Sequence, residues 1–102
     1  MTYEYAKKKI EEIYDKNLDH LKRLRKMVEP NPDWVDITTW FTIMDGCINE
    51  FSASANTVIE IYIELSNGEC ENWRALHQLK YDLLEKLKTE VSKNKDEIER
   101  PF

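Results

Sequence analysis

Hydrophobic residues in the middle third of the chain recur at alternating steps of four and three positions. The series is Ile37, Phe41, Met44, Ile48, Phe51, Ala55, Val58, Tyr62 and Leu65. This spacing aligns them on one face of a single long α-helix and predicts that the helix packs lengthwise against others. Asn31-Pro32 supplies start signals and Asn67-Gly68 a C-terminal cap, so we expect the helix to occupy residues 32–66.

Part of this segment could form a different structure. Residues 58–65 are rich enough in β-branched side chains to form a strand, and Gly46 or the weak helix formers at 52–57 could kink a helix. The apolar stripe nevertheless continues through the segment, and no partner strand is evident elsewhere in the sequence. The pattern therefore favours a helix throughout.

Two further amphipathic segments flank the central one. The apolar stripe of residues 2–28 is Tyr3, Ala6, Ile10, Ile13, Asn17, Leu21, Leu24 and Val28. The stripe of residues 73–99 is Trp73, Leu76, Leu79, Leu83, Leu87, Val91, Asn94 and Ile98. Thr2 and Asn72 are suitable N-caps, and Pro30 ends the first helix.

Three long helices with short connections predict one all-α domain over residues 1–102, an up-down-up antiparallel three-helix bundle. Additional apolar residues widen the arc of the central helix to roughly 200°. They are Trp40, Ile43, Cys47, Ile59, Ile61 and Ile63. Two neighbouring helices leave part of such an arc uncovered, so we expect a homodimer formed through the central helix. The alternative is a compact monomer in which this helix is simply central.

Charge is distributed unevenly along the 102 residues, whose formal net charge is −5. Residues 27–73 hold nine acidic residues and no Lys or Arg, whereas residues 1–26 and 74–102 are each slightly basic. The basic run Lys22-Arg23-Leu24-Arg25-Lys26 fits a solvated helix end, where the helix dipole favours cations. Because the acidic centre opposes a polyanion, nucleic acid is not an expected partner.

The hydropathy and the cysteine usage of the sequence predict a cytoplasmic protein. No apolar run is long enough to span a bilayer, and no secretory leader is visible, so no membrane partner is expected. Cys47 and Cys70 are separated by about 30 Å along a helix axis, which predicts two free thiols. In size and composition the chain resembles the short, acidic helical proteins common in phages and mobile elements, which implies a bacterial or host-cell cytoplasm.

No recognisable catalytic or metal-binding motif occurs. The carboxylate pattern of the all-α nucleotide pyrophosphohydrolases and the Glu-x-x-His pairs of di-iron bundles are absent. No cysteine or serine has an evident base, and His20 and His77 are predicted to lie about 28 Å apart. We therefore expect a protein that is not an enzyme and that carries no metal or cofactor.

Three polar residues are predicted to share one layer of the bundle: Asn17, Asp45 and Asn94. The two asparagines interrupt otherwise apolar stripes. A buried amide pair would fix the alignment of the helices at some cost in stability. The alternative is a functional polar pocket at this level.

Lys80 is predicted to point inward at one end of the bundle. It could extend to solvent or pair with a carboxylate, for which Glu4, Glu60 and Glu64 are candidates. It could instead form the cationic floor of an aromatic-walled pocket. The wall residues would be Tyr3, Tyr5, Trp73 and His77. Such a pocket would suit a nucleotide or another planar anion.

The outer face of the central helix offers hydroxyls, amides and carboxylates but no lysine. Its principal members are Asn49, Glu50, Glu60 and Glu64. Short side chains and charge of a single sign suit docking against the basic surface of a protein partner. The leading prediction is a non-catalytic interaction module, acting as an adaptor, inhibitor or small regulator. The alternative is a helical oligomer that binds or sequesters a small anion.

Overall fold

The computed structural model describes residues 2–28, 37–66 and 72–99. They form three α-helices: α1 (Tyr3–Val28), α2 (Ile37–Leu65) and α3 (Trp73–Glu99). These ranges contain no strand, so the all-α class is confirmed, and residues 58–65 are helical. The predicted start signals at Asn31-Pro32 and the cap at Asn67-Gly68 lie outside the described residues.

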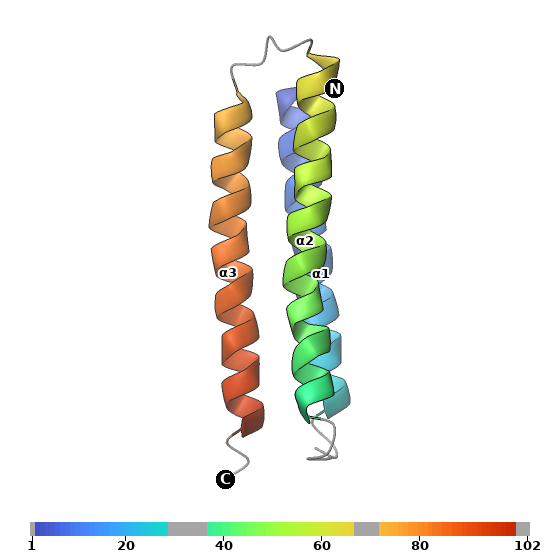
Figure 1. Cartoon of the computed structure of the whole chain (residues 1–102), viewed down its shortest axis with the longest axis vertical. Coiled ribbons are helices and arrows are strands. Elements are labelled where there is room, and N and C mark those ends of the chain that lie inside the picture. The colour runs from blue at the N-terminus through green and yellow to red at the C-terminus, as the bar shows by residue number, and fades with distance from the viewer. Residues whose placement is uncertain (1, 29–36, 67–71, 100–102) are drawn as a thin grey trace.

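The three helices pack side by side as a rod of 54 × 17 × 16 Å. Each helix contacts both others, which makes the fold a three-helix bundle. In Figure 1 the N-terminal end of α1 lies beside the C-terminal end of α2, at the end of the bundle where α3 begins. Among the described residues, none of the helices has the length and hydropathy needed to cross a membrane.

The core runs the length of the bundle, and α2 supplies the largest share. Its buried residues are Met44, Cys47, Phe51, Ala55, Ile59 and Tyr62. The predicted stripe is correct at four of these positions, whereas Phe41, Ile48 and Val58 are only partly buried and Leu65 is 62% exposed. Cys47 and Ile59 are buried more deeply because α1 and α3 cover α2 from two sides. A single line of 3-4 spacing describes only the middle of that broader arc.

Side-chain hydrogen bonds to the backbone occur at two helix ends, the start of α1 and the end of α2. The Oγ1 atom of Thr2 accepts a hydrogen bond from the backbone N–H of Tyr5 at 3.1 Å, which confirms the predicted N-cap. At the C-terminal end of α2, the Oγ of Ser66 donates to the carbonyl of Tyr62 at 2.7 Å. The same carbonyl also accepts the backbone N–H of Ser66 at 3.1 Å, so the hydroxyl adds a second hydrogen bond to it, which the sequence did not suggest.

Candidate functional site

The predicted partner-binding residues all lie on the solvent side of α2. Asn49, Glu50, Glu60 and Glu64 are exposed, and α2 contains no Lys or Arg. Glu60 and Glu64 make no hydrogen bond or ion pair with other residues that the structure describes. Their carboxylates are therefore available to a charged partner.

Gly46 lies on the same exposed face, within an uninterrupted stretch of helix. A Cβ atom built on Gly46 would meet nothing within 4 Å. Thr42, Asn49 and Ala53, one or two turns away, are also exposed and small. This part of α2 consequently presents its backbone close to solvent.

Glu50 occupies a different setting from Glu60 and Glu64. It borders a hollow of about 160 Å³ between α2 and α1. The α1 residues lining this hollow are Lys16, Asn17, Asp19, His20 and Arg23. One of the predicted partner-binding residues thus lies beside cations of its own chain.

Cys47 of α2 and His20 of α1 form a contact that the sequence did not reveal. The Sγ of Cys47 lies 3.8 Å from Nδ1 of His20. Cys47 is only 1% exposed, and burial, followed by the charge of Glu50, raises the pKa of its thiol. A buried neutral thiol is a poor nucleophile, so this pair is a packing contact. Cys70 lies outside the described residues.

The three residues of the predicted polar layer make separate contacts. Asn17, which is 2% exposed, donates from Nδ2 to the carbonyl of Ile13 at 2.9 Å, within its own helix. Asp45 accepts a hydrogen bond from Nζ of Lys95 at 2.7 Å. Asn17 shares the hollow with Glu50 because α1 lies roughly one helical turn further along α2 than the predicted pairing assumed.

Asn94, the third member, also bonds within its own helix. Its Nδ2 donates to the carbonyl of Glu90 at 2.7 Å. Every buried side-chain nitrogen or oxygen among the described residues has a hydrogen-bond partner. No unsatisfied polar group in this part of the chain therefore calls for a ligand.

Lys80, the centre of the predicted ligand pocket, reaches across to α2. Its Nζ donates to Oδ1 of Asn56 at 2.6 Å and lies 5.8 Å from the centre of the Tyr81 ring. Neither neighbour was among the predicted pocket residues. Tyr3, a predicted wall residue, is partly buried against the core.

The other predicted wall residues fall into two groups. The rings of Trp73 and His77 meet edge-on with centres 5.7 Å apart, and Arg74 lies over Trp73 at 5.3 Å. Tyr5 is half exposed and has Nζ of Lys9 5.9 Å from its ring centre. The structure brings Trp73 and His77 together, and it gives Tyr5 a different cationic neighbour.

Comparisons with protein-family models, curated proteins and solved structures returned no match. Within residues 2–28, 37–66 and 72–99, no group of three His, Cys, Asp or Glu side chains is placed to hold a metal ion. The geometry of the exposed surfaces is accordingly the basis for assigning a function.

Proposed function

We propose that this protein is a non-catalytic interaction module, an up-down-up helical bundle that docks a basic protein partner on the outer face of α2. It would act as an adaptor, an inhibitor or a small regulator. The observation that carries the proposal is the composition of this face: exposed carboxylates, small side chains and no basic residue.

Gly46 supports close approach of a partner. Glycine in an exposed helix interior costs about 1 kcal/mol relative to alanine. No contact within the described chain requires it, because a Cβ would enter open space. Glycine is favoured where another molecule must come near the backbone, and the small neighbours Thr42, Asn49 and Ala53 extend the same opening.

The carboxylates of α2 would orient a basic partner and raise the rate at which it encounters this face. Glu60 and Glu64 lie one turn apart and have no competing cation among the described residues. Single-sign charge of this kind steers a basic partner and makes its association sensitive to salt. Docking through α2 should therefore weaken as ionic strength rises.

A charge-reversal pair tests the proposal. Glu60→Lys with Glu64→Lys should lower affinity for a partner captured from the source cell by roughly tenfold or more. The matched control is Glu11→Lys with Asp15→Lys, which changes the same charge over the same spacing on α1, where both residues are exposed. Purified partner and a binding titration would provide the measurement. Equal affinities for the two double variants would remove α2 as the docking face.

We also propose that two copies pair along an apolar edge of α2. Ile43 and Ile61 are each 40% exposed and lie on the same side of the helix, and Leu65 is 62% exposed. Pairing would bury these side chains, which the single chain leaves in water. Light scattering should report a dimer that Ile43→Lys with Ile61→Lys converts to a monomer. Tyr81→Lys, at an exposed aromatic of α3, should leave the dimer intact.

A further inference from the structure

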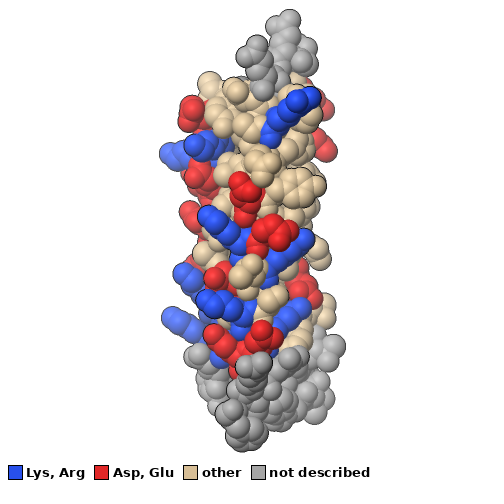
Figure 2. Space-filling view, turned by 90° about the vertical axis from the view of Figure 1, so that its left-hand side faces the viewer, with Lys and Arg blue, Asp and Glu red and all other residues tan. Residues whose placement is uncertain are grey.

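A cationic groove lies between α1 and α3, toward the C-terminal ends of both helices. It encloses about 420 Å³. The basic side chains that line it are Lys22, Arg23, Arg25, Lys26 and Lys93. Figure 2 looks at the side of the bundle that carries α3 and shows blue and red side chains interleaved over its lower half.

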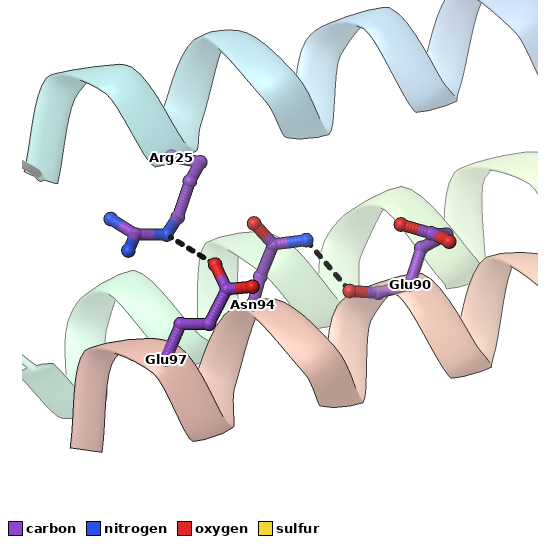
Figure 3. Close-up of polar contacts among 4 residues, drawn as sticks. All are labelled: Arg25, Glu90, Asn94 and Glu97. Carbon is purple, nitrogen blue, oxygen red and sulfur yellow. Dashed lines mark hydrogen bonds and ion pairs between the residues drawn. The ribbon is translucent and has the colours of Figure 1, made fainter. Parts of the chain in front are cut away.

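Arg25 is the least exposed cation of the groove. Its side chain is 20% exposed, and its Nε lies 3.4 Å from Oε2 of Glu97, on the opposite helix. Figure 3 shows the Arg25 side chain reaching from α1 toward α3, with Glu97 reaching back toward it. The guanidinium therefore lies at the groove, beside a carboxylate of α3.

Carboxylates compete for these cations without balancing them. Asp19, Glu90 and Glu97 line the groove against five basic residues, so the groove is net positive in a chain of net charge −5. Asp19 pairs with Arg23 along α1, and Glu97 pairs with Arg25. Both paired carboxylates have more than half of their side-chain surface exposed and could turn away toward water.

We propose that this groove binds a compact anion carrying several phosphoryl groups. Arg25 from α1 and Lys93 from α3 would contact it directly, and the ligand would replace Glu97 on Arg25. Arginine matches phosphate geometry with paired donors, and lysine adds a point charge. The volume lies within the range of small-molecule sites. This site uses different residues from Glu60 and Glu64, although Arg23 lines both the groove and the hollow beside Glu50.

The arrangement favours a small ligand over nucleic acid. Five cations converge on one hollow near one end of the bundle. A long polyanion would also meet the acidic central segment of the chain, residues 27–73. A compact ligand meets chiefly the charge of the groove itself, where basic residues outnumber carboxylates by five to three.

Two variants that break the same ion pair should have opposite effects. Arg25→Gln removes a proposed ligand contact, whereas Glu97→Gln removes the competing carboxylate. Calorimetric titration with sodium tripolyphosphate should show affinity lowered roughly tenfold by Arg25→Gln and raised by Glu97→Gln. Lys8→Gln is the matched control: it removes an exposed cation of α1 about 20 Å from Lys22 along the helix axis, and it should change nothing.

Further titrations distinguish the sources of the phosphoryl groups. Equal affinities for ATP and tripolyphosphate would mean that the groove recognises only phosphate groups. Stronger binding of ATP would indicate that the ligand is a nucleotide. Either result supports the site. No binding of tripolyphosphate by the wild type would overturn the proposal. So would equal weakening by both variants of the ion pair, because that pattern marks a structural role. A single-stranded oligonucleotide that binds more tightly than tripolyphosphate, and displaces it, would replace the compact ligand with nucleic acid.

Discussion

The outer face of α2 and the groove between α1 and α3 present opposite chemistry on one small bundle. On α2 the exposed polar side chains are short or acidic, and Glu60 and Glu64 have no partner among the described residues. In the groove the side chains are long and mostly cationic, and ion pairs hold Arg23 and Arg25. The net charge of −5 describes neither surface, so recognition by this protein has to be considered one helix face at a time.

A substitution in the hydrophobic core, on which both surfaces depend, should have the largest effect on stability. Phe51 is fully buried, and its ring meets that of Tyr14 edge-on with centres 6.0 Å apart. Phe51→Ala should lower the free energy of unfolding by about 3–5 kcal/mol, because it leaves a cavity between α1 and α2. Urea-induced unfolding would measure the loss. Thr57→Ala, at an exposed site of the same helix, should change stability by less than about 0.5 kcal/mol. Similar losses in the two variants would contradict the packing described.

Exchanging the charges of one surface at a time sharpens the comparison. Glu60→Lys with Glu64→Lys should weaken the protein partner and leave affinity for tripolyphosphate unchanged, whereas Arg25→Gln should do the reverse. The two surfaces use different helices, so their effects should add when the changes are combined. Titrations of both ligands against the three variants would measure this. An effect of either change on both ligands would show that the surfaces are coupled.

A change at Gly46 separates the needs of the fold from those of the partner. Gly46→Ala should raise the free energy of unfolding by about 0.5–1 kcal/mol, because alanine favours the helix and its Cβ meets no neighbour. The Gly46→Leu variant should also fold, but its larger side chain should weaken the partner complex by keeping the partner away from the backbone of α2. Thermal unfolding and the partner titration provide the two measurements. Destabilisation by alanine would show that the open space on α2 is filled in solution.

The buried thiol should give the smallest effect, at alkaline pH. Burial raises the pKa of Cys47 above its ordinary value of 9.0, so the folded state holds the proton more tightly than the unfolded state. This contribution to stability is complete below pH 9 and is lost as pH rises toward the higher folded pKa. Cys47→Ala should reduce the slope of stability against pH in that range, compared in urea titrations with the wild type. An unchanged slope would mean that another group causes the loss of stability at alkaline pH. Tyr14 is the next candidate, because burial also raises its pKa.

Hydrophobic periodicity predicted the helices well because it depends only on local geometry. The 3-4 series identified α2, and it placed Met44, Phe51, Ala55 and Tyr62 in the core. The same reasoning resolved the β-branched segment at 58–65 correctly, since a stripe that continues without interruption outweighs strand propensity.

Contacts between helices were harder to predict because they depend on rotation and on axial offset. Cys47 meets His20 across 27 positions of sequence, and Arg25 meets Glu97 across 72. A shift of about one turn between α1 and α2 was enough to move Asn17 from the level of Asp45 to the side of Glu50. No signal in one sequence fixes such an offset. The basic run on α1 was visible, but its partner Lys93 on α3 becomes part of the same hollow only through packing.

The side-chain amides of the asparagines on α1 and α3 donate within their own helices, which has a consequence for what joins the three helices. Neither Asn17 nor Asn94 donates across to a neighbouring helix from Nδ2. Between α2 and α3, Lys80 and Lys95 make short crosslinks of 2.6 and 2.7 Å, whereas α1 is joined to its neighbours through longer polar contacts of 3.4 and 3.8 Å. Polar crosslinking is thus tightest between α2 and α3, whereas α1 is joined to α2 chiefly by apolar packing such as the Tyr14–Phe51 ring contact. A change in the size of an apolar side chain should therefore disturb α1 more than a change of charge.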